Sequence, residues 1–280
     1  MGFISRTLFG TIPIGDFSPV VIMGIINLSP ESFYKGSYKS PSSLLETVQK
    51  FITNGAKILD LGARSTWIKA TPITLEDEKN RIIAALDLIK GKIPSEIIIS
   101  IDTQFAEVAK IALEFAKQNN IHLMINDVSS FRVDPKLMDV VVEYNCPVVI
   151  MATKEKPGDT RSVDEILVAL NNTILALSKK GYDLSQLIID PGIGKWTPEK
   201  TYEYDLAIID RLRDFRCFGC PILVGLSRKT FIGEILGESD PAKRDIGSLA
   251  ATSIAVYNGS HIIRTHDVDL AMKQTIQTAE

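Results

Sequence analysis

The sequence predicts an α/β protein, a (β/α)8 barrel of the TIM type with a hairpin at its amino terminus. Eight short apolar runs rich in β-branched residues recur along the chain, and a stretch with helical periodicity follows each run. Each run is apolar enough to be covered on both faces, which is typical of parallel strands flanked by helices. Eight such units favour a closed barrel, and a doubly wound open sheet is the structural alternative.

The predicted strands are residues 20–26, 57–62, 96–102, 121–127, 146–152, 187–192, 220–226 and 260–267. The predicted helices are residues 43–55, 74–89, 103–118, 135–145, 163–181, 197–215, 242–259 and 268–280. These helices begin at Ser, Thr, Asp or Pro, and several end at Asn-Gly or Lys-Gly, as capping chemistry predicts. Residues 1–19 predict a short hairpin that plugs the amino-terminal mouth of the barrel. We therefore expect one domain over residues 1–280.

Composition excludes several classes of protein. The chain has 280 residues, 45% of them hydrophobic, and a net charge of −3, which gives no basic surface for nucleic acid. No apolar run reaches the roughly 18 residues that span a bilayer, and the first ten residues lack the apolar centre of a signal peptide. We expect a cytoplasmic enzyme that binds no nucleic acid and no membrane.

The three cysteines, Cys146, Cys217 and Cys220, fit a reducing compartment. The C-x-x-C spacing of Cys217 and Cys220 could indicate a redox pair or half of a zinc site. A structural zinc site needs four ligands, and the sequence has no second C-x-x-C or paired histidines. We therefore interpret both cysteines as small apolar residues that precede a strand.

Polar residues follow the predicted strands at their carboxyl ends, where βα loops converge in a TIM barrel. Taken singly, these residues have structural explanations: Asp102 could cap a helix, Asn126 and Asp190 could cap loops, and Lys229 could be a solvated helix residue. Six strands presenting such groups at one end favour a shared site. The set is Asn27, residues 62–66 including Thr66, Asp102, Asn126 with Asp127, Met151, Asp190, Ser227 through Lys229, and Arg264 with His266.

These residues divide into two kinds of chemistry. Asp102, Asn126 and Asp190 supply acceptors and an amide suited to the edge of a flat, nitrogen-rich heterocycle. Arg264 and His266, with the Asn27 oxygen for a hard metal, suit a phosphate or pyrophosphate. Lys229 could serve either group as a point charge. One site would thus bind an aromatic heterocycle at one end and an anion at the other.

Seven short motifs resemble those of the dihydropteroate synthase family and occur in the same order: "GIINLSPESF", "ILDLGARST", "ISIDT", "INDVS", "DPGIG", "VGLSRKTFIG" and "IIRTHDV". The resemblance covers almost the whole chain. It implies condensation of hydroxymethyl-dihydropterin pyrophosphate with para-aminobenzoate or a substituted aminobenzoate, with release of pyrophosphate and help from Mg²⁺. Methyl transfer from a methyl-pterin to a corrinoid protein is the alternative, but "SRKTF" and "RTHDV" favour the synthase.

The resemblance also implies residue roles. Asp102, Asn126, Asp190 and Lys229 would hold the pterin, whereas Asn27, Arg264 and His266 would hold the pyrophosphate. Lys229 and Thr230 would lie near the aminobenzoate, and Thr66 would contact substrate. The expected catalytic residues are Asp102, which would stabilise a cation-like methylene, and Lys229. Asn27 is the expected ligand of Mg²⁺, and the expected assembly is a homodimer of an archaeal-type member of the family.

Three departures from the family pattern fall in loops. Trp67 and Ile68 replace the usual Arg-Pro, Lys35 stands where an Asp is expected, and Lys195 with Trp196 replaces an aromatic and a small residue. We hypothesise that residues 29–37 form a mobile loop that closes over the substrates. Lys35 would then supply the positive charge that Trp67 no longer provides, unless it is a solvated residue at the loop tip.

Overall fold

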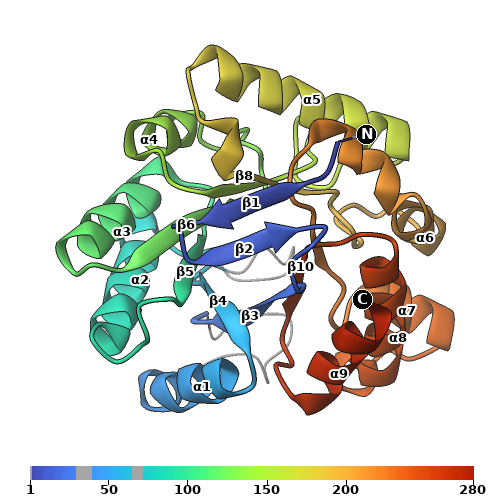
Figure 1. The fold of residues 1–280 in the computed structure, drawn as a ribbon, viewed down its shortest axis with the longest axis horizontal. Helices are drawn as coiled ribbons and strands as arrows, with labels where there is room; N and C mark the ends of the chain where they lie inside the picture. Colours follow the sequence, from blue (N-terminus) through green and yellow to red (C-terminus); the bar gives the residue numbers. More distant parts are fainter. Residues whose placement is uncertain (1, 30–39, 65–71) are drawn as a thin grey trace.

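The computed structural model describes residues 2–29, 40–64 and 72–280. One parallel eight-stranded sheet forms the centre of the molecule, with strand order β8-β7-β6-β5-β4-β3-β10-β9. Helices surround the sheet (Figure 1). The strands are β3 (Val21–Asn27), β4 (Ala56–Gly62), β5 (Ile98–Asp102), β6 (His122–Asp127), β7 (Val148–Met151), β8 (Leu187–Asp190), β9 (Leu223–Gly225) and β10 (Ile262–Thr265). Every predicted strand is present.

The sheet closes on itself between its first and last strands. Ile189 of β8 forms a parallel bridge with Ile222, next to β9, and the Ile189 N–H donates to the Pro221 carbonyl at 3.0 Å. A closed sheet of eight parallel strands with helices outside it is a (β/α)8 barrel. The predicted fold is confirmed, and the open sheet is excluded.

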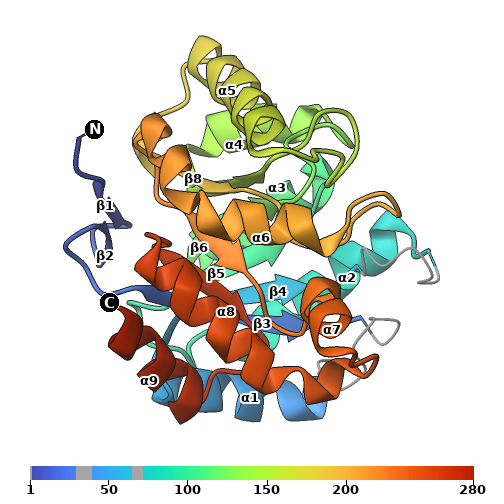
Figure 2. The same ribbon diagram turned by 90° about the vertical axis from the view of Figure 1, so that its right-hand side faces the viewer.

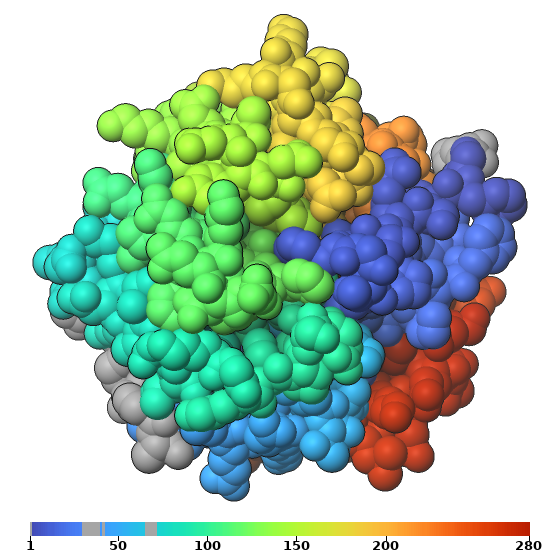
Figure 3. Space-filling view, turned by 60° about the vertical axis from the view of Figure 1, so that its left-hand side comes forward, coloured from blue at the N-terminus to red at the C-terminus, as the bar shows by residue number. Residues whose placement is uncertain are grey.

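The amino-terminal hairpin covers one mouth of the barrel. Strand β1 (Ser5–Leu8) pairs antiparallel with β2 (Ile12–Gly15), and Figure 2 shows both at one end of the molecule. Leu8, Ile12 and Ile14 join the inward-facing apolar residues of the strands in one buried cluster. In the space-filling view the dark blue amino-terminal segment lies flat against the surface (Figure 3). The predicted plug is therefore present. Its apolar face packs against the apolar interior of the barrel.

The helices are α1 (Pro41–Thr53), α2 (Leu75–Ile89), α3 (Ala106–Gln118), α4 (Lys136–Tyr144), α5 (Val163–Lys179), α6 (Tyr202–Asp210), α7 (Thr230–Leu236), α8 (Asp245–Tyr257) and α9 (Leu270–Ala279). Seven of them begin and end within three residues of the predicted bounds. Helix α7 was not predicted, and the predicted helix 197–215 is instead α6 followed by a 3-10 helix at Leu212–Phe218. Within the described ranges, we find no helix both long and apolar enough to cross a bilayer.

The inward-facing side chains change character along each strand. In β4, Ile58 belongs to the interior apolar cluster, whereas Leu59 and Leu61 face the helices. Asp60 and Gly62 share the inward face with Ile58 because successive side chains of a strand alternate between its two faces. The barrel is therefore apolar next to the hairpin and polar at the carboxyl ends of its strands, which is where the predicted site lies.

Candidate active site

Four neighbouring strands end in one row of inward-facing residues. The parallel register places Asn27 of β3 opposite Gly62, Gly62 opposite Asp102 of β5, and Asp102 opposite Asn126 of β6. A methyl group at residue 62 would lie 3.4 Å from Asn27 Oδ1 and 3.8 Å from Asp102 Oδ2. Gly62 thus leaves open the space between the Asn27 amide and the Asp102 carboxylate.

Arg264 of β10 lies across this row and contacts two carboxylates. Its Nε donates to Asp60 Oδ2 at 2.6 Å, and its Nη2 donates to Asp102 Oδ2 at 2.8 Å. Asn126 Nδ2 also donates to Asp60 Oδ2, at 3.3 Å. The sequence grouping had placed Arg264 with the anion site and Asp102 with the heterocycle site, but in the structure the two are directly paired.

Asp60 is a site residue that the sequence reasoning missed. Its side chain is fully buried, with an exposed fraction of 0%. It lies inside a strand, not after one, so a search of strand ends does not find it. The signal was a carboxylate in the apolar run "KILDLG", two residues before Gly62 and therefore on the same inward face. A buried carboxylate needs a charged or hydrogen-bonding partner, and Arg264 provides it.

Burial and charge together set the protonation of this cluster. Burial raises the pKa of Asp102 to about 7, an effect that the Arg264 guanidinium opposes and the Asp60 carboxylate reinforces. Burial alone would lower the pKa of Arg264, but the carboxylates of Asp60 and Asp102 outweigh it and raise that pKa. Arg264 is therefore a permanent cation at the floor of the site.

The suggestion that Asp102 caps a helix is wrong, because α3 begins at Ala106, whose N–H is bonded to Asp134.

Asp190 and Lys229 form a second part of the site. Asp190 Oδ1 accepts a hydrogen bond from the Gly192 N–H at 2.7 Å, so this residue does cap its loop, and Lys229 Nζ donates to the Ile193 carbonyl of the same loop. Burial lowers the pKa of Lys229 to about 8, whereas the carboxylate of Asp190 acts to raise it. Burial also raises the pKa of Asp190, and Lys229 opposes that shift.

The buried ion pair of Lys200 and Asp205 holds the backbone of the loop at residues 190–194. Lys200 Nζ donates to the Gly192 carbonyl at 2.6 Å and lies 3.1 Å from Asp205 Oδ1. The same Asp205 oxygen accepts from the Gly194 N–H at 2.8 Å. Both charged side chains are buried, and each satisfies a backbone group of the loop, as buried charges require. The backbone of the loop that carries Asp190 is therefore tied to a buried ion pair.

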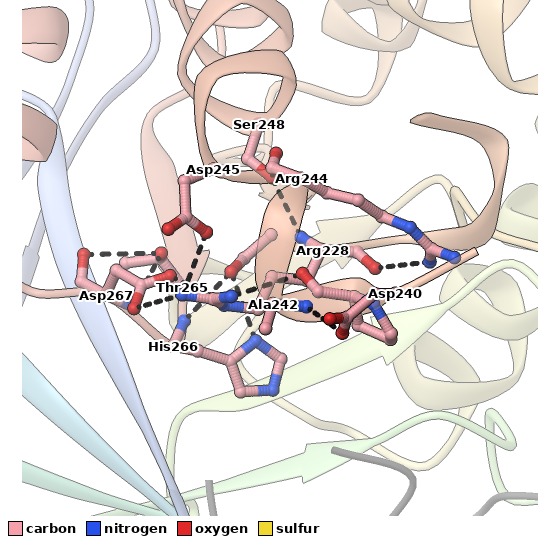
Figure 4. Close-up of polar contacts among 11 residues, drawn as sticks. Arg228, Asp240, Ala242, Arg244, Asp245, Ser248, Thr265, His266 and Asp267 are labelled. Atoms are coloured by element: carbon pink, nitrogen blue, oxygen red, sulfur yellow. Dashed lines mark hydrogen bonds and ion pairs between the residues drawn. The ribbon is translucent and has the colours of Figure 1, made fainter. Parts of the chain in front are cut away.

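His266 follows β10 and contacts the turn after β9. Its Nδ1 lies 3.1 Å from Ser227 Oγ, and its backbone N–H donates to the same hydroxyl at 3.3 Å. Figure 4 shows His266 beside the side chain of Arg228. Burial lowers the pKa of His266 to about 3, and the cations Arg264, Arg228 and Lys229 add to this shift. The imidazole is therefore a neutral hydrogen-bonding group at physiological pH.

The remaining predicted residues are placed as follows. Thr230 is the first residue of α7 and follows Lys229. Lys195 Nζ lies 2.6 Å from Glu234 Oε1 of α7, and the Trp196 ring lies 5.7 Å from Lys229 Nζ. Thr66, Lys35 and Trp67, and the loop hypothesis for residues 29–37 beyond Ser29, lie outside the described residues.

The described residues contain no cluster of three or more His, Cys, Asp or Glu side chains that could hold a metal ion.

All three cysteines are free thiols. Of the C-x-x-C pair, Cys220 is buried, as the interpretation of a small apolar residue requires, whereas Cys217 is exposed, so the interpretation is wrong for that residue; Cys146 is buried too. Cys217 lies on the outer side of the 3-10 helix at Leu212–Phe218, whose buried side chains are Leu212 and Phe215.

A cavity of about 510 Å³ lies at the opposite end of the barrel. It is lined by residues of the hairpin, the start of β3 and the end of α9, including Thr11, Val21 and Gln277. None of the predicted site residues contributes to it. In a (β/α)8 barrel the amino-terminal end serves stability and the carboxyl end carries the chemistry, so we place the active site at the carboxyl end.

The polar residues at the carboxyl ends of the strands mark the active-site end of a (β/α)8 barrel enzyme, and comparison with known sequences identifies its family. The family described as "Pterin binding enzyme" matches residues 23–266. Two bacterial relatives named dihydropteroate synthase cover most of the chain. That of Escherichia coli is 33% identical over 94% of this chain and 90% of its own length. That of Synechocystis is 32% identical over 92% and 89%. The chain belongs to the dihydropteroate synthase family, whose members are transferases.

Solved structures support the assignment. The dihydropteroate synthase of Coxiella burnetii, solved in complex with pteroic acid, aligns with a TM-score of 0.83 at 32% identity over 99% of this chain and 97% of that one. The Xanthomonas albilineans enzyme, solved with 4-aminobenzoic acid, gives the same TM-score and coverage at 30% identity. A folic acid synthesis protein of Pneumocystis carinii is 35% identical, but the chain spans only 34% of its length. The corrinoid methyltransferase alternative is not favoured.

Proposed function

We propose that the chain condenses hydroxymethyl-dihydropterin pyrophosphate with para-aminobenzoate or a substituted aminobenzoate, releasing pyrophosphate. The observation that carries this proposal is the buried contact of Arg264 with both Asp60 and Asp102 beside Asn126. It brings a cation, two carboxylates and an amide together at the carboxyl end of a barrel that belongs to the dihydropteroate synthase family. These are the groups that a pterin and a pyrophosphate require.

The pterin would bind against Asp102, Asn126 and Asp190. Their carboxylates accept hydrogen bonds, and the Asn126 amide can both donate and accept, which matches the alternating donors and acceptors of a pterin edge. Lys229 lies beside Asp190 and adds a positive charge at this end of the site. The fixed loop at residues 190–194 would hold Asp190 in place when the ligand binds.

In the proposed reaction the bond between the pterin methylene carbon and a pyrophosphate oxygen breaks, and the electron pair leaves with pyrophosphate. The amine nitrogen of the aminobenzoate forms the new bond to that carbon and then loses its proton to water. Asp102 would stabilise the positive charge that develops on the methylene. Arg264 Nη1, which makes neither carboxylate bond, could donate to the leaving pyrophosphate. The amine is nucleophilic when neutral, so the site needs mainly to position it.

Mg²⁺ fits this site only as an ion that arrives with the pyrophosphate. Asn27 offers one amide oxygen, Gly62 leaves space beside it, and a three-ligand cluster is absent from the described part of the chain. Mg²⁺ commonly uses one or two protein ligands together with substrate phosphates and water. When bound, it would neutralise charge on the leaving group. We therefore retain Asn27 as the proposed protein ligand.

The test is pyrophosphate release from the pterin pyrophosphate with a panel of aminobenzoates, including para-aminobenzoate and ring-substituted forms. Release should require an amine, and Asp102→Asn, which keeps the shape of the side chain, should lower kcat roughly 100-fold or more because one preorganised charge is lost. Release without any amine, or full activity in the variant, would contradict the proposed reaction.

We also propose that the enzyme is a cytoplasmic homodimer. Large apolar side chains are exposed on adjacent helices α7, α8 and α9, among them Ile246, Tyr257 and Leu270, with exposed fractions of 83%, 71% and 65%. Helices α8 and α9 lie side by side at the front of Figure 2. An apolar surface of this kind favours contact with another protein, and the free thiols fit a reducing compartment.

A further inference from the structure

The turn between β9 and α7 contains a strained residue. Arg228 has a φ of +60°, in the left-handed region that side chains other than glycine rarely adopt. The turn is closed by the Lys229 N–H, which donates to the Leu226 carbonyl at 3.3 Å. A left-handed residue costs roughly 1–2 kcal/mol, so surrounding contacts must hold it.

The side chain of Arg228 binds three other segments of the chain. Its Nε and Nη2 donate to the two oxygens of Asp267 at 3.0 and 2.9 Å, in the paired geometry that a guanidinium makes with a carboxylate. Nη2 also lies 2.8 Å from Asp245 at the start of α8, and Nη1 donates to the Pro241 carbonyl at 3.1 Å. Figure 4 shows the guanidinium of Arg228 beside Asp245 and Asp267.

The backbone of Arg228 is held as firmly as its side chain. Its N–H donates to Ser248 Oγ at 2.9 Å, and its carbonyl accepts from Arg244 Nη1 at 3.0 Å. Arg244 is itself buried and donates to the carbonyls of Glu238 and Ser239. Arg228 could therefore leave the left-handed conformation only if several of these hydrogen bonds broke at the same time.

The two neighbours of Arg228 are both at the active site. Ser227 contacts the ring of His266, and Lys229 contacts the loop that carries Asp190. Asp267, which Arg228 binds with two hydrogen bonds, directly follows His266 in the chain. Arg228 thus joins the carboxyl ends of β9 and β10 from outside the substrate site.

We propose that Arg228 is a positioning residue that fixes His266 and Lys229 relative to one another through its contact with Asp267. This inference rests on the proposed function, in which His266 and Lys229 bind the pterin pyrophosphate. Arg228 itself need not touch substrate. A displacement of about 1 Å in such groups can lower catalysis roughly 100-fold, so a residue outside the site can control the reaction.

Three variants separate the contributions of Arg228. Arg228→Gly keeps the left-handed backbone without strain but removes the side chain. Arg228→Lys keeps the positive charge but cannot make the paired contact with Asp267. Asp267→Asn changes the partner and leaves Arg228 in place. The matched control is Arg211→Lys, because Arg211 also contacts two carboxylates, those of Asp214 and Asp164, but does so on the surface.

The experiment measures two quantities in each variant: calorimetric affinity for inorganic pyrophosphate with Mg²⁺, and titration of the His266 ring by NMR. In Arg228→Gly and Asp267→Asn we expect pyrophosphate affinity to fall roughly tenfold or more. Arg228→Gly also removes a cation that lowers the pKa of His266, so the titration is decisive in Asp267→Asn and Arg228→Lys, which keep a positive charge at residue 228. In these two variants the His266 titration midpoint should still move up toward the ordinary value, because the ring is no longer held among its buried neighbours. Arg228→Lys should show a smaller loss, and Arg211→Lys none.

The outcomes distinguish the two proposals. A merely structural Arg228 would lower the melting temperature but leave pyrophosphate affinity within twofold in every variant and the His266 titration unchanged in Arg228→Lys and Asp267→Asn, which would overturn the positioning role. If the unaltered protein does not bind pyrophosphate but the His266 titration responds as expected, the positioning role stands and the proposed function fails. Asp267→Asn provides the same test should Arg228→Gly fail to fold.

Discussion

A single carboxylate oxygen of Asp60 orients the guanidinium of Arg264. Asp60 Oδ2 accepts from both Arg264 Nε and Asn126 Nδ2, so this single atom orients a cation and an amide that we assign to different ends of the substrate. Arg264 retains Asp102 as a second carboxylate partner. Removing the Asp60 charge should therefore loosen Arg264 without leaving it unpaired in the interior.

The first prediction is that Asp60→Asn lowers pyrophosphate affinity roughly tenfold, since a hydrogen bond to a charged group contributes about 1.5–3 kcal/mol. Isothermal titration calorimetry with pyrophosphate and Mg²⁺ measures the effect. Asp87→Asn is the control, because Asp87, an exposed residue of α2, pairs with the exposed Lys90 at the end of that helix. Equal affinity in Asp60→Asn and the unaltered protein would show that Arg264 does not depend on Asp60.

The second prediction concerns His266 and pH. The pKa of His266 is about 3 in the folded protein, whereas an unfolded histidine has a pKa of 6.5. Below pH 6.5 the unfolded state takes up a proton that the folded state does not. The neutral ring therefore contributes stability above pH 6.5, and that stability is lost as the pH falls from 6.5 toward 3. The slope from one such group is at most about 1.4 kcal/mol per pH unit.

Urea unfolding of the unaltered protein and of His266→Gln, measured from pH 5 to pH 7.5, tests this linkage. The free energy of unfolding of the unaltered protein should fall more steeply with decreasing pH than that of the variant, which cannot titrate at this position. The comparison also removes the contribution of His261, whose pKa burial likewise lowers. Parallel curves for the two proteins would mean that His266 is protonated as easily when folded as when unfolded.

At the scale of elements, the predictable features were those with a repeating pattern. The eight apolar runs identify the strands because a parallel strand is covered on both faces, and Asn145, in the left-handed conformation at the end of α4, shows why Asn and Gly mark helix ends. Helix α7 escaped prediction because it has seven residues, too few for a clear period, and contains Gly233. Arg244 donates to backbone carbonyls on both sides of α7, those of Arg228, Glu238 and Ser239, and no local pattern reveals these contacts.

Gly233 supplies the third prediction. A Cβ at this position would lie 2.5 Å from the Glu238 carbonyl oxygen and 2.5 Å from Arg244 Nε. The oxygen belongs to the backbone and cannot move freely, so Gly233→Ala should destabilise the protein by about 1–3 kcal/mol, the usual cost of overpacking. Chemical denaturation measures the loss. Gly2→Ala is the control, because nothing lies within 4 Å of its added methyl group; equal stability of the two variants would contradict the steric account.

At the scale of the whole molecule, the barrel brings together residues that are far apart in the chain. Asp60, Asp102 and Arg264 come from β4, β5 and β10, which lie within one run of the sheet, β5-β4-β3-β10, and the side chains meet on the inward face of this run. The sequence could predict that Asp102 and Arg264 lie at one end of the barrel, because strand ends converge there. It could not predict that they are paired, or that Arg228 binds Asp267, because such contacts depend on side-chain directions that register and loop geometry decide.

The last prediction is that the exposed apolar surface of α8 and α9 forms a homodimer interface. Ile246 and Ile254 of α8 have exposed fractions of 83% and 53%, and Leu270 of α9 has 65%. Isolated apolar residues are normal on a protein surface, but several on two helices that contact each other favour association. Light scattering after size-exclusion chromatography should give twice the mass of one chain, 30.9 kDa, and the double variant Ile246→Asp, Ile254→Asp should give the monomer mass because charges oppose burial there. Val168→Asp is the matched control on α5, with an exposed fraction of 61% on another part of the barrel, and should leave the mass unchanged. A monomeric unaltered protein would contradict the homodimer. A dimer that persists in the double variant would mean that the interface lies elsewhere on the protein.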